Sequence, residues 1–369
     1  MTAGERLARA AVLTATRRAE IAVVEDFGDG RPRHHGRPGP TTPDAVTVTV
    51  HDPAAYRAVL ARGSVGLGTS YAAGWWDSDD LVGVVRSAIR HLPSPSGRLG
   101  RIAGDLGRLG GLGPGRHSAA RNGLDSRAED RSDVQAHYDL GDEFFAAFLD
   151  PTLTYSCAYF ERPGTSLEEA SVAKLDRLCA KLDLGPDDEV LEIGTGWGSF
   201  AVHAAARYGC RVTTTTISDR QFAFARRRVA EAGLDHLVTV RNDDYRDLHG
   251  QWDKVVSVEM IEAVGWRQYR TFFAACAGLL RPDGLMALQA IVIDDARYER
   301  AKRVDDFIKA VVFPGSCIPS VGAIVAVTTG ATDLRVVGLE DIGAHYAETL
   351  HRWRARFLDH RRAIAELGF

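Results

Sequence analysis

The stretch Val190–Ser199, VLEIGTGWGS, decides the fold of this chain. Its apolar start is typical of a buried strand, and a turn of three glycines follows: Gly194, Gly196 and Gly198. A helix is expected directly afterwards, near Phe200–Tyr208. Glycines suit such a turn because the backbone bends tightly and a ligand must approach it closely. The pattern predicts a cofactor site at the end of this strand, although nicotinamide and flavin enzymes use related turns.

The acidic residue before the glycines narrows the choice of cofactor. Dinucleotide enzymes place a pyrophosphate at the helix N-terminus, and the carboxylate of Glu192 would repel it. A sulfonium compound that also carries an ammonium group would be attracted to that carboxylate. We therefore expect S-adenosylmethionine rather than a dinucleotide, and a glycine turn without any ligand is the remaining alternative.

The residues around this turn alternate between strand and helix patterns from about residue 133 onward. The expected strands are Glu189–Ile193, Arg211–Ile217, Val238–Arg241, Lys254–Val258, Leu285–Ile293 and Leu334–Leu339. A last helix is expected at about Ala344–Leu367. Strands that alternate with helices predict a mostly parallel sheet covered by helices on both faces, an α/β fold of the Rossmann-like class I methyltransferase type.

Residues 1–92 differ in pattern and predict a small N-terminal α+β domain. Ala45–Val50 alternates as a strand, and Pro53–Arg62 is expected to be a helix opened by Asp52. Residues 93–131 are rich in Gly, Ser, Pro and Arg and predict a linker. Arginines and apolar residues within 98–109 also allow a basic amphipathic turn on an anionic membrane, and a solvated linker is the alternative. Residues 132–369 then form the methyltransferase domain.

Composition excludes several classes of protein. The chain has 369 residues, a formal charge of −4, 45% hydrophobic and 25% charged residues, which is typical of a globular protein without non-specific nucleic-acid binding. No apolar run approaches the roughly 20 residues that cross a bilayer. Arg17, Arg18 and Glu20 interrupt the stretch Ala10–Val24, so we expect no signal peptide and a cytoplasmic location. The five cysteines form no CxxC pair, which predicts neither a metal site nor a disulfide framework.

Two further positions are candidates for nucleotide contacts. Asp219 lies where the spacing rule of dinucleotide folds places the acidic ribose ligand. Asp244 and Tyr245 follow the third expected strand, where a carboxylate and a ring could hold adenine. Exposed acids in a loop are as often only solvated.

Several motifs together resemble the cyclopropane fatty acid synthase family. They are HYDLGDEFFAAFLDPTLTYSCAYFE (137–161), VLEIGTGWG (190–198), TISDRQ (216–221), DYRDL (244–248) and FPGSCIPS (313–320). SVEMIEAVG (257–265) and HYAETLHRW (345–353) are most similar to actinobacterial members that make 10-methyl fatty acids. The resemblance covers about residues 45–369.

The resemblance implies a set of cofactor-binding residues. They are Tyr155, Ser156, Glu192, Gly194, Thr195, Gly196, Gly198, Thr216, Ser218, Gln221, Asp244 and Tyr245. At the ribose it favours Gln221 over Asp219, because other members vary at the acidic position. It also implies a bound bicarbonate as the catalytic base, with ligands at Cys157, Glu262, Gln289, the Ile291 backbone and Tyr346. Many members carry a histidine where this chain has Gln289, and Glu262 is followed by Ala263 rather than histidine.

The implied reaction transfers a methyl or methylene group to the cis double bond of an unsaturated phospholipid acyl chain. An isolated alkene is a poor nucleophile, so the methyl donor must be held in line and away from water. A base must then remove a proton from the new methyl group for the ring to close. Aromatic side chains could stabilise the cation or simply pack: Tyr138, Tyr155, Tyr159 and Phe160. A hydride shift would instead give a methylene branch, which a separate reductase could convert to a methyl branch.

The sequence pattern and the resemblance also give expectations about the acyl pocket, the N-terminal domain and the last strand of the sheet. Phe307–Pro319 is expected to form the wall of an acyl pocket, or else a buried structural loop. The N-terminal domain is expected to engage the membrane surface or a partner subunit, including a second copy of the chain. Family members continue beyond Phe369, so we expect the closing antiparallel strand of the sheet to be missing. The alternatives are a methyltransferase for soluble small molecules and an inactive cofactor-binding protein.

Overall fold

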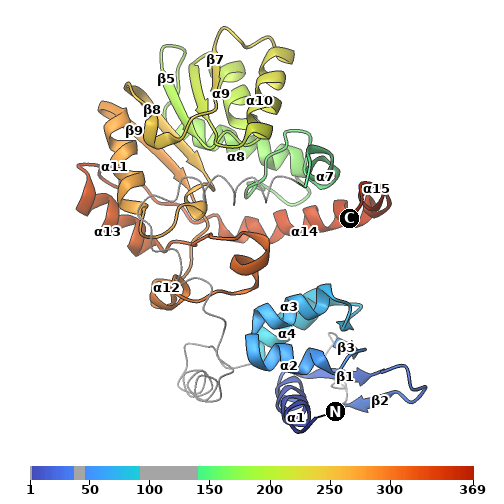
Figure 1. Ribbon diagram of the computed structural model, residues 1–369. Coiled ribbons are helices and arrows are strands. Elements are labelled where there is room, and N and C mark those ends of the chain that lie inside the picture. The colour runs from blue at the N-terminus through green and yellow to red at the C-terminus, as the bar shows by residue number, and fades with distance from the viewer. Residues whose placement is uncertain (1, 37–45, 92–139) are drawn as a thin grey trace. The chain divides into compact units, whose positions relative to one another are not determined.

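The structure is a computed structural model that describes residues 2–36, 46–91 and 140–369 (Figure 1). The chain divides into two compact units. The first contains the N-terminal region together with Glu299–Pro314, and the second contains the rest of the methyltransferase region. The sequence did not indicate that Glu299–Pro314 joins the N-terminal unit. The expected linker 93–131 lies outside the described residues.

The N-terminal unit is a small sheet with helices. Its strands are β1 (Ile21–Glu25), β2 (Arg33–His35), β3 (Val46–Val50) and β4 (Trp76–Asp77), in the order β2-β1-β3-β4. Its helices include α1 (Ala3–Arg18), α2 (Ala54–Arg62), α3 (Ser64–Ala72) and α4 (Leu81–His91). Asp52 accepts a hydrogen bond from the Ala54 N–H at 2.8 Å, as expected for the residue that opens α2. The predicted α+β character of this region therefore agrees with its structure.

The segment Glu299–Pro314 packs within this unit through an aromatic ring. The Phe307 ring lies against Gly68 of α3, where a Cβ atom would come within 2.1 Å of the ring carbon Cδ2. A glycine is therefore required at this helix position. The short π-helix η4 (Ile308–Val312) follows Phe307 directly.

The methyltransferase unit is built on a parallel sheet. Its strands are β5 (Glu189–Ile193), β6 (Arg211–Thr215), β7 (Val238–Arg241), β8 (Trp252–Val258) and β9 (Leu280–Gln289). They pair in the order β7-β6-β5-β8-β9, and every pairing is parallel. The helices are α7 (Asp142–Phe148), α8 (Leu167–Lys181), α9 (Ser199–Tyr208), α10 (Asp219–Glu231), α11 (Tyr269–Leu279), α12 (Asp295–Ala301), α13 (Val321–Ala331), α14 (Gly343–Asp359) and α15 (Arg361–Glu366).

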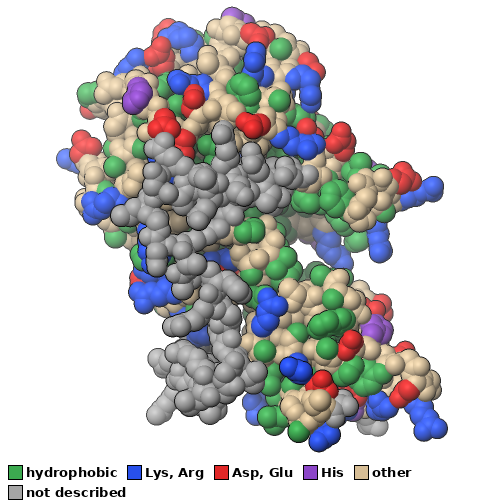
Figure 2. Space-filling model, viewed as in Figure 1, with side chains coloured by type: hydrophobic (Ala, Val, Ile, Leu, Met, Phe, Trp, Pro, Cys, Tyr) green, Lys and Arg blue, Asp and Glu red, His purple; other side chains and the backbone are tan. Residues whose placement is uncertain are grey.

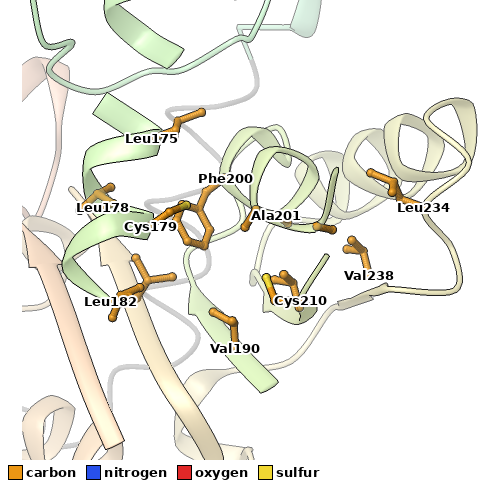
Figure 3. Close-up of a cluster of buried hydrophobic side chains, with 14 of the residues drawn as sticks. Leu175, Leu178, Cys179, Leu182, Val190, Phe200, Ala201, Cys210, Leu234 and Val238 are labelled. Carbon is orange, nitrogen blue, oxygen red and sulfur yellow. The ribbon is translucent and has the colours of Figure 1, made fainter. Parts of the chain in front are cut away.

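Both faces of this sheet are covered, as the sequence predicts. Successive side chains of a strand point to opposite faces. Val190 and Val256 accordingly pack with α8 and α9, whereas Leu191 and Val255 pack with α11. Figure 3 shows the first of these cores, with Leu178 of α8 and Leu182, directly after that helix, on the side of the cluster nearest Val190.

Helix α8 begins at a clear sequence signal and ends in this core. Ser166 caps its first turn by accepting from the Glu169 N–H, and the Glu169 carboxylate accepts from the Ser166 N–H. Apolar residues then recur at helical spacing, ending in Leu182, which is fully buried.

The structure corrects the sequence prediction at the end of the sheet. Leu334–Leu339 was expected to be a strand, but no strand forms there, and Val337 is 87% exposed. Within the described part of the chain, β9 pairs only with β8. A short alternating apolar run becomes a strand only beside a partner, so periodicity alone could not decide this segment. The helix expected at Ala344–Leu367 is divided into α14 and α15 at His360.

Truncating Leu182 to alanine should destabilise the methyltransferase unit by about 2–5 kcal/mol, because a cavity replaces a fully buried side chain. Guanidinium denaturation followed by tryptophan fluorescence measures this change. Leu358→Ala is the control, since Leu358 is 47% exposed on α14 and should change stability by less than about 0.5 kcal/mol. Equal effects of the two substitutions would contradict the described core.

Candidate active site

A cavity lies at the carboxyl ends of β5, β6 and β8. Strand β5 pairs with β6 on one side and β8 on the other, so the strand order reverses there. Ligands of open α/β sheets bind at such switch points. Ten of the predicted cofactor residues line the cavity: Tyr155, Ser156, Glu192, Gly194, Thr195, Gly196, Thr216, Gln221, Asp244 and Tyr245.

The glycine turn brings bare backbone to the cavity. Gly194 and Gly196 have φ values of +103° and +53°, a region that side chains disfavour. The remaining two predicted residues do not appear among the described residues that line the cavity. Gly198 starts α9 in a left-handed conformation, and the Ser218 hydroxyl accepts from the Gln221 N–H at 3.3 Å. Both shape the site rather than line it.

Of the two candidates for the ribose contact beside β6, Gln221 lies at the cavity and Asp219 is not among the described residues that line it. Gln221 lines the cavity, and its amide oxygen accepts from the Thr216 hydroxyl at 2.8 Å. Asp219 does not appear among the described lining residues, and its carboxylate accepts from the Asn242 amide at 2.6 Å.

The residues after β7 form a rigid group at another part of the cavity. Arg246 forms a two-point ion pair with Asp244, at 2.8 and 2.6 Å, and donates to the Gln268 amide oxygen at 3.0 Å. The Tyr245 ring meets Phe272 edge-on at 5.5 Å. Asp244 is therefore a fixed carboxylate rather than a solvated loop residue.

Two buried titratable groups, one acidic and one basic, line the cavity close to the glycine turn. Glu192 is 2% exposed and accepts from the Thr214 hydroxyl at 2.6 Å. Burial raises the pKa of Glu192 to about 8. Lys174 of α8 is 3% exposed and donates to the Ser156 hydroxyl at 2.8 Å, and burial lowers the pKa of Lys174 to about 8. The sequence analysis did not identify Lys174.

Glu259, directly after β8, is a residue of this site that the sequence did not predict. Its Oε1 accepts from the Cys157 N–H and from the Gln289 amide, both at 2.8 Å. Its Oε2 accepts from the Tyr346 hydroxyl at 3.1 Å. The residue also has a φ of +47°, a strained conformation that structures retain mainly at functional sites. Cys157, Gln289 and Tyr346 thus come together as predicted, but around a protein carboxylate.

Burial raises the pKa of Glu259, and the donors Cys157, Gln289 and Tyr346 oppose that rise by stabilising the charged form. Three donors on one carboxyl group favour its ionised state. An acidic residue at the carboxyl end of a parallel strand was the available signal for Glu259.

Glu262, the other carboxyl group, has fewer hydrogen-bond partners than Glu259. Its Oε1 accepts from the Ile291 N–H, whereas Oε2 is buried without a hydrogen-bond partner among the described residues. Burial and then the nearby Glu259 raise the pKa of Glu262 to about 8. Glu262 therefore holds its proton more strongly than an exposed carboxyl group does. Its backbone carbonyl accepts from the Cys317 N–H at 2.7 Å, which shows a structural role for part of the stretch expected to form an acyl wall.

The aromatic rings that could stabilise a cation differ in what they contact. Trp353 lies 5.2 Å from Tyr155 and 6.3 Å from Tyr346, measured between ring centroids. Tyr159 instead packs on His345 at 4.4 Å and under the Arg177 guanidinium at 4.5 Å, which indicates a packing role. Phe160 also stacks against His345, and Tyr138 lies outside the described residues.

The rest of the described surface and interior adds little chemistry. All five cysteines are buried, and none of them forms a disulfide bond among the described residues. Across residues 2–36, 46–91 and 140–369, no group of side chains could hold a metal ion and no helix could span a bilayer. Figure 2 shows acidic and basic side chains interspersed on the visible face of the methyltransferase unit.

Comparison with known proteins gives consistent matches. Residues 125–368 match the family model described as mycolic acid cyclopropane synthetase. Tuberculostearic acid methyltransferase UfaA1 of Mycobacterium tuberculosis is 40% identical over 345 residues, which covers 90% of this chain and 77% of that protein. The cyclopropane-fatty-acyl-phospholipid synthase of Escherichia coli is 37% identical and covers 84% of this chain and 76% of its own length.

Solved structures show the same fold. The cyclopropane synthase MmaA2 from Mycobacterium tuberculosis aligns with a TM-score of 0.61 and 31% identity, covering 67% of this chain and 88% of its own. The mycolic acid cyclopropane synthase CmaA1, in a complex with S-adenosylhomocysteine and CTAB, aligns with a TM-score of 0.59 and 32% identity, covering 64% and 86%.

Replacing Glu192 with glutamine should stabilise the protein without ligand, increasingly so as the pH rises. The pKa of this carboxyl group is near 4.5 when unfolded and about 8 when folded, so the folded state holds the proton more tightly. Between these values Glu192 lowers stability progressively with rising pH, and Glu192→Gln removes that loss. Thermal unfolding at about pH 5 and about pH 8 tests the trend.

Glu340→Gln is the matched control. The Arg177 guanidinium holds the pKa of Glu340 at about 2, so its stabilising effect is complete throughout this pH range. Its difference from the wild type should stay constant. A constant difference for Glu192→Gln as well would contradict the raised pKa of Glu192.

Proposed function

Because the chain belongs to the mycolic acid cyclopropane synthetase family, we propose that it transfers a one-carbon unit from S-adenosylmethionine to the double bond of an unsaturated lipid acyl chain. The observation that carries this proposal is the carboxylate of Glu259, fixed by Cys157, Gln289 and Tyr346 at the cavity that Glu192 also lines. Methyl transfer to an alkene needs such a base, whereas transfer to a basic nitrogen does not.

The cavity fits S-adenosylmethionine. Glu192 supplies a buried carboxylate for its ammonium group, and Gly194 and Gly196 leave room beside the backbone. Gln221 can contact the ribose, while Asp244 and Tyr245 can hold the adenine edge and face. When bound, S-adenosylmethionine supplies an electrophilic methyl group to which the alkene contributes its π electrons.

Bicarbonate, which the resemblance implies as the base, does not fit the donors as they stand. The Cys157 N–H, the Gln289 amide and the Tyr346 hydroxyl already donate to Glu259. A second anion there would have to displace a carboxylate that is part of the chain. We therefore assign the role of the base to Glu259 and route no step through bicarbonate.

Glu259 then acts on the substrate cation. Addition of a methyl group to one alkene carbon leaves a positive charge on its neighbour. Glu259 accepts a proton from the new methyl group, and the released C–H electron pair neutralises the cation. Because three donors hold Glu259, the carboxylate is restrained from forming an ester with the cation. Tyr155 lines the cavity and Tyr346 donates to Glu259, so the faces of these two rings can stabilise the positive charge of the substrate cation.

The fate of the cation sets the product. A hydride shift before proton loss gives a methylene branch, and direct closure gives a cyclopropane ring. Likeness to UfaA1 over 90% of the chain, a protein named for tuberculostearic acid, favours the branch. The Escherichia coli relative, named for cyclopropane formation, supports the ring as the second candidate. Reduction of the branch to a methyl group would need a hydride from a separate reductase.

Contact with a membrane is part of the proposal, since the substrate is a phospholipid. On α4, Val82, Val85 and Ile89 are exposed beside Arg86, an arrangement that suits the surface of an anionic bilayer. The cytoplasmic location, the acyl wall at Phe307–Pro319 and a homodimer stay predictions.

The two carboxyl groups should respond oppositely to amide substitution. Glu259→Gln removes the base and should lower product formation by at least about 100-fold while binding of S-adenosylmethionine persists. Glu262→Gln replaces a carboxyl group whose pKa is raised to about 8 with a neutral group of similar shape, and should keep most of the activity. Transfer of a radiolabelled methyl group to oleoyl phospholipid vesicles measures both. Loss of activity in Glu262→Gln alone would overturn the assignment.

The same assay should be insensitive to bicarbonate. Activity in CO2-free buffer should match that in buffer with added bicarbonate, because Glu259 occupies the donors. A strict requirement for bicarbonate would show that it displaces Glu259.

The ring and methylene products have equal mass, so ozonolysis is needed to distinguish them. Only the methylene product is cleaved to a ketone.

A further inference from the structure

Lys174 lines the cofactor cavity, yet the chemistry above gives it no task. Its ammonium group is almost fully buried, at 3% exposure, on the face of α8 that meets the core. A buried ammonium is unfavourable unless it is well paired. The position therefore calls for an explanation.

The protein satisfies this ammonium only in part. An ammonium has three N–H groups, and among the described residues Ser156 is its single hydrogen-bond acceptor, at 2.8 Å. No carboxylate within the described chain lies within ion-pair distance of Lys174. Glu192 and Glu259 act on it only from farther away, by favouring its charged form. Two N–H groups are left for an acceptor that the cavity would have to receive.

The cofactor offers such an acceptor. The methionyl part of S-adenosylmethionine carries an ammonium and a carboxylate on the same carbon atom. Glu192 matches the ammonium, so the carboxylate must lie close by. Lys174 and Ser156 line the same cavity as Glu192, and the charges of Lys174 and Glu192 influence each other.

We propose that Lys174, together with the Ser156 hydroxyl, binds the carboxylate of the methionyl part of S-adenosylmethionine. Glu192 and Lys174 then form a zwitterion receptor in which each buried charge meets its opposite when the ligand enters. This inference rests on the cofactor assigned above. To Ser156, which the resemblance already implied, it adds Lys174, which neither the glycine turn nor the resemblance indicated.

A simpler role for Lys174 is to stabilise Glu259 across Ser156 and Cys157. The two roles differ in what they predict for binding. A carboxylate receptor distinguishes ligands with and without a carboxylate. A purely electrostatic support for Glu259 affects both ligands alike.

Calorimetric titration of the full chain with S-adenosylmethionine and with decarboxylated S-adenosylmethionine provides the test. The second ligand keeps the sulfonium and the ammonium but has no carboxylate. The wild type should prefer the first. In Lys174→Met, affinity for S-adenosylmethionine should fall by about 10- to 100-fold, the loss expected for a charged hydrogen bond. Affinity for the decarboxylated ligand should stay equal or rise, because a repelling cation is gone.

Lys181→Met is the matched control, since Lys181 lies on the same helix but is 47% exposed in its side chain and pairs with Glu340. It should leave both affinities unchanged. Lys174→Gln, with thermal unfolding of each variant, guards against a loss of fold. Equal weakening of both ligands in Lys174→Met, or no weakening of either, would overturn the inference. A wild type that binds neither ligand would instead refute the proposed function.

Discussion

The hydrogen bonds that converge on the Glu259 carboxylate are the constraint on which the site depends. They join three segments that lie far apart in the chain: the loop at Cys157, the end of β9 at Gln289, and α14 at Tyr346. Burial raises the pKa of Glu259, and the three donors oppose that rise by stabilising its charged form. Glu259 also has a positive φ, and these hydrogen bonds can offset the strain of that conformation.

Several titratable groups at this site are buried. Glu192, Lys174 and Glu262 all have pKa values moved towards neutrality by burial, each to about 8. Such groups weaken the folded state, and a protein retains them where a ligand or a reaction uses them. The core in Figure 3, which includes Val190 and Phe200 on either side of the glycine turn in the sequence, supplies apolar burial that offsets this weakness.

The sequence predicted much of this architecture because its signals are local. The glycine turn after β5, the alternation of strands and helices, and the cap of α2 by Asp52 each depend on neighbouring residues. Ten of twelve predicted cofactor residues line the cavity, since strand ends of a parallel sheet meet at one edge. Glu259 and Lys174 were missed because their importance comes from burial and from partners that are not their neighbours in the sequence, between 30 and 102 residues away for Glu259. Leu334–Leu339 was predicted wrongly because a strand also needs a neighbour.

The order in which the chain passes between the two units determines whether a single proteolytic cut releases a fragment. The chain leaves the N-terminal unit after α4, returns to it at Glu299, and leaves again after Pro314. Three crossings join the units, so a single protease cut after α4 frees no fragment by itself. The N-terminal piece would be retained by its packing on Glu299–Pro314, with the Phe307 ring seated on Gly68. The protein can therefore survive a nick that would separate two domains strung on a simple linker.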